Sequence, residues 1–166
     1  MGTINLSNEL LYQFAIESNR MSDITNPAAD VVHHEALVEL LTSEKITTNT
    51  LLTFVTKIEP MSGLRENDKE VVISGTRLPN STTSNIRLMF LLKKLNSGEG
   101  QHPWFTHMNI MELHPFTDGN ARVARAMWLW NMVKNFNFDL HTDFSRTFYN
   151  QTFERYLGFH LALNGE

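Results

Sequence analysis

Apolar residues recur at helical spacing along most of this chain, and turn-forming residues separate one apolar stretch from the next. In residues 8–20, Leu10, Leu11 and Phe14 form one stripe, and Ser7 is placed to cap the first turn. The same pattern predicts further helices at about residues 27–42, 84–95, 103–113 and 121–134, and one that starts at Thr47 or Thr48 and stops near Pro60. We therefore expect a mainly α fold.

Residues 60–83 interrupt this pattern. They are rich in Gly, Asn, Asp, Pro, Ser and Thr, and they contain one β-branched run, Val71-Val72-Ile73, which is the only strand-like region. Residues 121–134 are apolar nearly all round, which predicts a buried central helix. The aromatic tail at residues 143–163 is expected to add one or two closing helices.

Length and composition favour one compact domain. The chain has 166 residues, of which 42% are hydrophobic and 19% are charged, so a single sizeable core is possible. The net charge of -4 provides no basic surface for nonspecific nucleic-acid binding, and the absence of cysteine excludes disulfides and thiolate zinc sites. The first nine residues lack a basic start followed by an apolar core, and no apolar run approaches about 18 residues, so we expect no cleaved export signal and no membrane span. A soluble, cytoplasmic protein without nucleic-acid or membrane partners is expected, although delivery to another cell stays open.

Residues 114–125 concentrate groups suited to phosphate chemistry. His114 titrates near neutrality, Asp118 suits a hard cation such as Mg²⁺, and Gly119-Asn120 can turn backbone N–H groups toward an anion. If a helix starts near Asn120, its positive end faces the same turn. Arg122 and Arg125 then share a helix face and are expected to point at a polyphosphate. His114 is the expected base and Asp118 the expected metal ligand.

Each of these residues also has an ordinary structural explanation. A His-Pro-Phe sequence often ends a helix, Asp-Gly-Asn is a common turn, and Arg-x-x-Arg is often a solvated face. Elsewhere, His33-His34-Glu35 does not have metal-ligand spacing, and the Met and Trp residues between 127 and 132 are expected to pack in the core. His107, two helical turns before His114, is expected to pack or to support that residue. The ordered combination in residues 114–125 is what favours an active site.

The segment resembles the signature of the Fic family, His-x-Phe-x-Asp/Glu-Gly-Asn-Gly-Arg-x-x-Arg. The resemblance covers residues 5–160, and residues 63–79 resemble the family's flap, a β-hairpin that holds the target segment. The motif matches at His114, Phe116, Asp118, Gly119, Asn120, Arg122 and Arg125. The resemblance implies a single Fic-type helical bundle with a short hairpin beside the active-site loop.

The resemblance also implies a function, the Mg²⁺-dependent transfer of AMP from ATP to a Ser, Thr or Tyr hydroxyl of another protein. In this interpretation His114 is the general base, Phe116 anchors the loop, and Asp118 holds Mg²⁺. The implied phosphate-binding residues are Gly119, Asn120, Ala121, Arg122 and Arg125. The implied docking flap, which pairs with the target chain by strand addition, comprises Val71, Val72, Ile73 and Ser74. Alternatives are another donor such as UTP, phosphoryl transfer, or an inactive nucleotide-binding or protein-binding module.

The sequence departs from the family's motif at Ala121, where glycine is usual. If this position has helical dihedral angles, alanine favours the helix; if φ is positive, the strain is about 1–2 kcal/mol. We expect the helical case, because Arg122 and Arg125 must follow in register.

A second departure concerns inhibition. Many family members block their ATP site with a helix carrying Ser/Thr-x-x-x-Glu-Gly/Asn, whose glutamate pairs with the motif's second arginine. The nearest stretch here begins at Ser18 and has Ser22 at the glutamate position. The sequence therefore predicts no glutamate clamp on Arg125. The site is then open, or inhibited by a separate antitoxin-like protein, or imperfectly clamped by Asp23.

Overall fold

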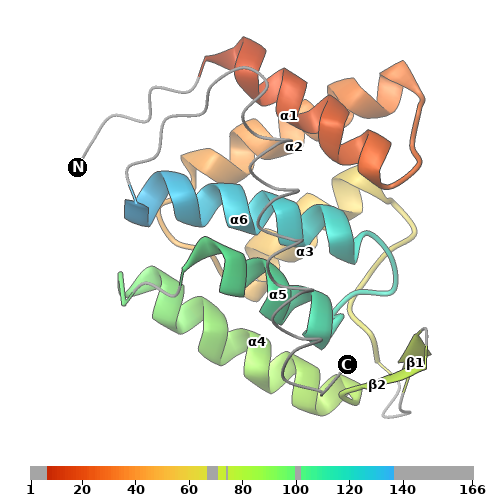
Figure 1. Cartoon of the computed structure of the whole chain (residues 1–166), viewed down its shortest axis with the longest axis vertical. Coiled ribbons are helices and arrows are strands. Elements are labelled where there is room, and N and C mark those ends of the chain that lie inside the picture. The colour runs from red at the N-terminus through yellow and green to blue at the C-terminus, as the bar shows by residue number, and fades with distance from the viewer. Residues whose placement is uncertain (1–6, 67–70, 74, 100–101, 137–166) are drawn as a thin grey trace, which may run out of the picture.

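The computed structural model describes residues 7–66, 71–73, 75–99 and 102–136, and this part of the chain is mainly helical (Figure 1). The helices are α1 (Asn8–Met21), α2 (Pro27–Thr42), α3 (Thr48–Ile58), α4 (Ser81–Asn96), α5 (Pro103–Leu113) and α6 (Asn120–Phe136). The strands are β1 (Val71–Ile73) and β2 (Thr76–Leu78). The expected mainly α fold with a short hairpin is confirmed. The closing helices predicted at residues 143–163 lie outside the described residues.

Side-chain caps begin the helices where the sequence predicted them. Ser7, Asn26 and Thr47 each accept a hydrogen bond from a backbone N–H in the first turn of α1, α2 and α3. The predicted start of α4 at residue 84 was wrong by three residues. Asn80 Oδ1 accepts from the Thr83 N–H at 2.8 Å, so the cap lies earlier, and the threonines of the first turn are helical despite their low helix propensity.

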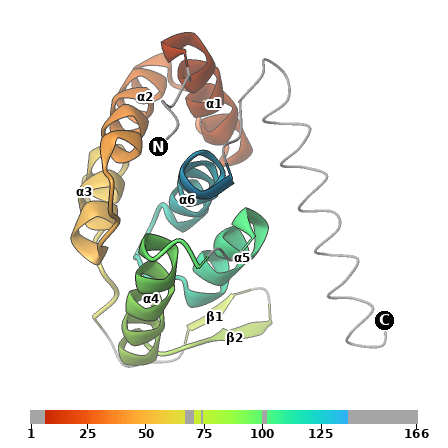
Figure 2. The ribbon, with the colours of Figure 1, turned by 90° about the vertical axis from the view of Figure 1, so that its left-hand side faces the viewer.

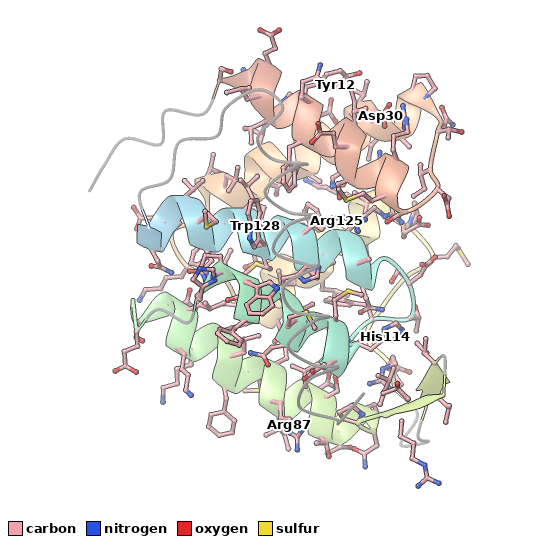
Figure 3. All side chains as sticks on the ribbon, viewed as in Figure 1. Tyr12, Asp30, Arg87, His114, Arg125 and Trp128 are labelled. Carbon is pink, nitrogen blue, oxygen red and sulfur yellow. The ribbon has the colours of Figure 1, made fainter. Side chains whose placement is uncertain are left out.

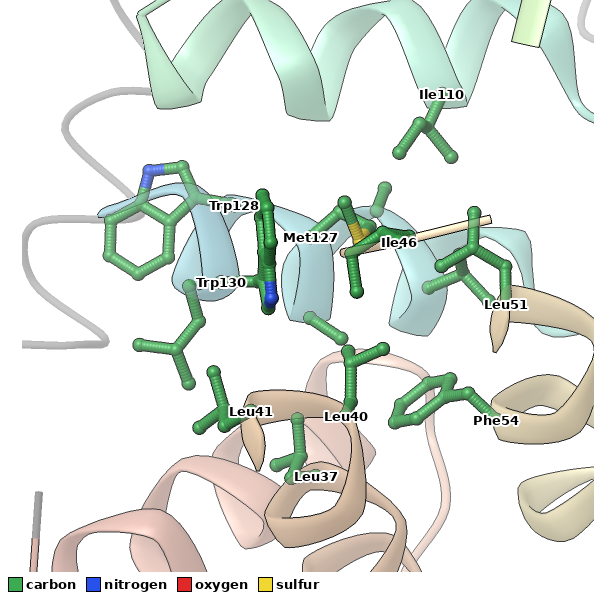
Figure 4. Packing of buried hydrophobic residues seen from close by; sticks show 14 of the residues in the cluster. Leu37, Leu40, Leu41, Ile46, Leu51, Phe54, Ile110, Met127, Trp128 and Trp130 are labelled. Carbon is green, nitrogen blue, oxygen red and sulfur yellow. The ribbon is translucent and has the colours of Figure 1, made fainter. Parts of the chain in front are cut away.

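Helix α6 lies at the centre of the bundle, as its all-round apolar pattern predicted. Figure 2 shows α6 end-on with the other helices around it, and every residue from 122 to 133 is buried. Figure 4 shows Met127 and Trp130 facing Leu40 and Leu41 of α2. The Trp130 indole N–H also donates to the Ser43 carbonyl at 3.1 Å. Because α6 lies at the centre, the surrounding helices pack against it and fix the position of its first turn.

The hairpin projects from one end of the bundle, beside the start of α4 and the end of α5 (Figure 1). Its strands are antiparallel, with Val71 opposite Leu78 and Ile73 opposite Thr76. Gly75 has a φ of 80°, a left-handed conformation that suits glycine in this turn. Within the described residues, no helix combines the length and apolarity needed to cross a membrane.

Candidate active site

The loop between α5 and α6 is bound to the segment that leads into the hairpin. Leu64 and Phe116 form an antiparallel β-bridge, and backbone bonds on either side join Thr117 N–H to the Gly63 carbonyl at 2.9 Å and Arg65 N–H to the Pro115 carbonyl at 3.0 Å. This pairing holds the base of the hairpin against the loop that carries the sequence motif.

Phe116 and Asn120 hold the loop from inside. Phe116 is fully buried, and the Asn120 side chain contacts its backbone twice: Oδ1 accepts from the Phe116 N–H at 2.9 Å and Nδ2 donates to the Phe116 carbonyl at 2.8 Å. The Asn120 amide is therefore occupied by the loop itself. Only the backbone N–H of Asn120 is left to bind an anion, which is the function that the sequence predicted for this residue.

Gly119 is required by both conformation and space. Its φ is 80°, and a Cβ at this position would lie 2.9 Å from Val55 Cγ2 of α3. Any other residue would be strained and would also push against α3. The turn can approach α3 this closely only because residue 119 has no side chain.

Ala121 lies in the first turn of α6 and has helical dihedral angles. Among the described residues other than glycine, only Asp23 and His114 have positive φ. The helical alternative is thus the correct one, and alanine carries no backbone strain here. The Gly119 carbonyl accepts the first bond of α6, from Val123 N–H. In the described part of the chain, the N–H groups of Asn120, Ala121 and Arg122 have no acceptor, so they remain available to an anion.

A pocket of about 400 Å³ opens at this turn. His114, Asp118, Gly119, Asn120, Ala121 and Arg122 line it together with Ser22, Ile24, Glu59, Met111 and Thr117. The structure thus gathers the predicted base, metal ligand, turn and first arginine around one cavity. Ser22, which the family resemblance placed opposite Arg125, also lines the pocket, whereas Glu59 at the end of α3 was not indicated by the sequence.

His114 occupies the C-cap of α5 in a left-handed conformation, with φ 46° and ψ 58°. Such a conformation is uncommon for histidine and is often found at functional sites. Partial burial and the nearby Arg65 guanidinium lower the pKa of His114, and Asp118 opposes the shift. The imidazole is therefore neutral at pH 7 and can accept a proton.

Asp118 is exposed at the edge of the pocket. Its Oδ1 accepts from the Gly119 N–H at 2.7 Å, while Ser62 bonds to its backbone through both the N–H and the carbonyl. No group of three or more His, Asp or Glu side chains suited to a metal occurs among the described residues. The Asp118 carboxylate alone would suffice for a Mg²⁺ ion that is bound mainly through phosphates and water. Mg²⁺ keeps several of its waters and needs few protein ligands.

Arg122 is paired with a carboxylate that sequence reasoning missed. Its Nη2 forms a short ion pair with Glu59 Oε1, at the C-cap of α3, and both residues line the pocket. The Arg122 side chain is 5% exposed and the Glu59 side chain is 30% exposed. A phosphate that binds Arg122 must therefore compete with Glu59 or share the guanidinium with it. Nothing in the spacing of the two residues, 63 positions apart, could have indicated this pair.

Arg125 is not among the residues that line the pocket, so its expected contact with a polyphosphate stays a prediction. Its Nε donates to Ser18 Oγ and its Nη2 to the Ser18 carbonyl, both at 2.8 Å, and Nη2 also donates to Ser22 Oγ. In Figure 3, Arg125 lies on the α1 side of α6, and His114 lies at the end of α5 nearer the hairpin. Side chains three residues apart on a helix differ in direction by about 60° around its axis. Helix α1 covers the face of α6 on which Arg125 lies.

A buried polar network holds the end of α1 in this place. Asn19 Nδ2 donates to Asp30 Oδ1 at 2.9 Å, and Arg20 forms two bonds to the same carboxylate, at 3.0 and 2.7 Å. His33 Nδ1 lies 2.7 Å from Asn19 Oδ1. These bonds join α1 to α2, and they therefore keep Ser18 and Ser22 against Arg125.

Two other histidines are buried and neutral. Burial, followed by the charges of Arg122 and Arg125, lowers the pKa of His33 to about 3, and burial with Arg125 lowers the pKa of His107 to about 3. Neither His33 nor His107 is among the residues that line the pocket.

Val71, Val72 and Ile73 of the predicted docking flap form β1. Val72 is 59% exposed and Ile73 is 42% exposed, so both are accessible to another chain. Ser74 and the side chain of Val71 lie outside the described residues. No family model matches the chain, and no curated protein matches its sequence.

Proposed function

We propose that this chain is a protein adenylyltransferase that moves AMP from ATP to a hydroxyl of a target protein. The observation that carries the proposal is the position of His114, a neutral base on the same pocket as Asp118, Arg122 and the free N–H groups of α6. A base, a carboxylate for Mg²⁺ and donors for phosphate oxygens are what transfer between a nucleotide and a hydroxyl requires. The resemblance of residues 114–125 to the Fic signature supports the same conclusion.

In the proposed reaction, His114 takes the proton of the target hydroxyl as its oxygen attacks the α-phosphorus of ATP. The bond from that phosphorus to the bridging oxygen breaks, and pyrophosphate leaves. The N–H groups of Ala121 and Arg122 and the positive end of α6 stabilise the phosphate charge. Asp118 would hold Mg²⁺, which neutralises charge on the phosphates. The exposed edge of the hairpin would hold the target chain extended beside His114.

Labelled ATP separates this function from its alternatives. The purified protein is incubated with a lysate, Mg²⁺ and ATP carrying the label at either the α or the γ position. Transfer of the α label alone supports the proposal, and the modified protein should gain the mass of AMP. The His114→Ala variant should lose the signal and still bind ATP. Transfer of the γ label alone would instead indicate phosphoryl transfer, and the same incubation with UTP tests the other donor.

A second candidate is a nucleotide-binding module without turnover. The pairing of Arg122 with Glu59 favours it, because this carboxylate occupies a group that phosphate would need. For this candidate, MgATP binds measurably and neither label is transferred. A separate inhibitor protein is a partner compatible with either candidate, and it would be recovered as a stable complex from the native host.

A further inference from the structure

A second hollow lies beside the hairpin. Its volume is about 450 Å³, and three elements form it: β2, the outer face of α4 and the last turns of α5. Thr76, Arg77 and Leu78 contribute the whole of β2 to the wall. The hollow is therefore continuous with the hairpin that the proposed function uses to hold the target.

Positive charge gathers around an apolar floor in this hollow. Arg87 and Lys94 are seven residues apart on α4, so they lie on one face about two turns apart, with Phe90 between them. Phe90 is 63% exposed, a large exposure for an aromatic side chain. The floor is formed by Leu78, Pro79, Leu91 and Leu113.

The two cations on α4 are available to a partner. Both Arg87 and Lys94 are exposed, and in the described part of the chain neither side chain takes part in a hydrogen bond or ion pair. The whole chain has a net charge of -4, so this positive surface is not a consequence of a basic composition. Figure 3 shows Arg87 on α4 toward the end that carries the hairpin.

We propose that this hollow docks the target protein by binding an acidic segment that carries an apolar side chain; this inference rests on the proposed transfer function. The acidic side chains would pair with Arg87 and Lys94, and the apolar side chain would pack on Phe90 and the floor. Backbone pairing at the hairpin alone accepts almost any sequence, so the hollow supplies the specificity that strand addition lacks.

Two features favour an acidic protein segment over nucleic acid. The Glu112 carboxylate lines the hollow and would repel a phosphodiester backbone, whereas a peptide can direct its acidic residues away from it. The floor is also aliphatic, with four apolar side chains that suit a Leu or Phe side chain.

The position of the hollow relative to His114 is set by Arg65. This side chain donates to the carbonyl of Pro79, which lines the hollow, and to the carbonyl of His114, which lines the first pocket. A segment bound in the hollow is therefore held in a defined relation to the proposed base. An extended chain running from the hollow along the hairpin can present a hydroxyl at the first pocket.

Peptide binding tests the docking without requiring transfer. The probe is a fluorescein-labelled peptide with Asp and Glu around one Phe and one Thr, and its matched control carries Lys at each acidic position. Fluorescence anisotropy should show tighter binding of the acidic peptide, weakening as salt is raised. The double variant Arg87→Glu/Lys94→Glu should bind it about tenfold more weakly or worse.

A matched variant separates a local effect from net charge. Lys45→Glu/Lys93→Glu makes the same change of charge at two exposed lysines that line a different pocket, on the other side of α4. It should retain the affinity of the native chain for the acidic peptide. Equal weakening in both double variants, or equal binding of both peptides, would overturn the proposal. So would selective binding of labelled oligothymidine that only Arg87→Glu/Lys94→Glu abolishes.

Labelling of a lysate with α-labelled ATP extends the test to natural targets. Bands labelled by the native chain should be lost with Arg87→Glu/Lys94→Glu and retained with Lys45→Glu/Lys93→Glu, with both variants melting at the same temperature. Retention of all bands by the first variant contradicts the docking. If the native chain labels no protein, the transfer function fails, and the peptide measurement still decides whether the hollow binds acidic segments.

Discussion

The guanidinium of Arg65 donates to the backbone carbonyl of His114, and its second amino group reaches the Leu113 and Pro79 carbonyls at 2.9 Å each. One buried cation thus joins the base of the hairpin, the end of α5 and the proposed catalytic base. It also lowers the pKa of that base, after the larger effect of burial. Arg65 therefore links the position of the hairpin to the protonation state of His114.

Replacing Arg65 with Gln should raise the pKa of His114, because the cation that disfavours imidazolium is removed. A base with a higher pKa stays protonated to a higher pH, so the acid limb of kcat/KM should move upward. The loss of bonds to buried carbonyls should also lower the free energy of unfolding by about 1–3 kcal/mol. The checks are a pH–rate profile and an NMR titration. Arg65→Lys keeps the positive charge, so it should move the acid limb of the pH–rate profile less than Arg65→Gln does. If the two variants gave the same pH–rate profile, the charge of Arg65 would not be what lowers the pKa of His114.

Replacing Glu59 with Gln should tighten MgATP binding. The carboxylate competes with phosphate for Arg122, and the amide is a weaker competitor because it carries no charge. We expect the dissociation constant, measured by calorimetry, to fall by about tenfold, equivalent to about 1.4 kcal/mol. Glu39→Gln is the matched control, since Glu39 pairs with Lys57 and does not line the pocket. Unchanged or weaker binding in Glu59→Gln would show that the pair does not oppose nucleotide.

Replacing Ser22 with Glu should inhibit transfer. Ser22 Oγ already accepts from the Arg125 guanidinium, so a carboxylate from the same position reaches that group and adds negative charge beside the phosphate site. We expect the rate to fall about tenfold or more. Ser22→Ala should not show this loss, because it adds no charge. Asp23→Asn tests the remaining acidic candidate: a large rise in automodification would mean that Asp23 restrains the enzyme.

Residues 119 and 121 should respond oppositely to exchanging glycine and alanine. Gly119→Ala should destabilise the fold by about 1–2 kcal/mol from its positive φ alone, and further through contact with Val55. Adding Val55→Ala should remove the part of this destabilisation that comes from the contact between the new Cβ and Val55. A double-mutant cycle of chemical denaturation measures that part. Ala121→Gly should cost about 1 kcal/mol in helix propensity and leave the transfer rate unchanged. A large gain in rate would mean that the Ala121 methyl group crowds the nucleotide.

The fold should weaken on mild acidification because His33 and His107 are buried in neutral form. Their pKa values of about 3 lie below the unfolded value, so the unfolded chain binds more protons as pH falls below about 6.5. Stability is complete above this pH and should decline by about 1.4 kcal/mol per pH unit for each histidine as pH falls toward 3. Urea denaturation between pH 6 and 4.5 measures the slope. His33→Gln should roughly halve it; an unchanged slope would refute the assignment.

Local chemistry determined the helices and their starts. Ser7, Asn26 and Thr47 cap α1, α2 and α3, because capping depends on groups within the same turn. The all-round apolar pattern of α6 likewise predicted its central place, since such a helix must be covered on every side. The exception was the start of α4, where Asn80 capped a turn of low intrinsic propensity.

The sequence by itself also determined the order of groups along the motif loop, from His114 through Asp118 to Arg122, because consecutive residues cannot separate in space. The family resemblance placed Ser22 opposite Arg125, but only the tertiary structure decided the partners of Arg122 and His114. Glu59, Ser22 and Arg65 reach Arg122, Arg125 and His114 from 49 to 103 residues away. Such contacts depend on how helices pack, and no periodicity along the chain encodes which distant side chain meets a given guanidinium or carbonyl. The packing therefore pairs Arg122 with the carboxylate of Glu59 in the pocket and joins Arg125 to two serines at the end of α1.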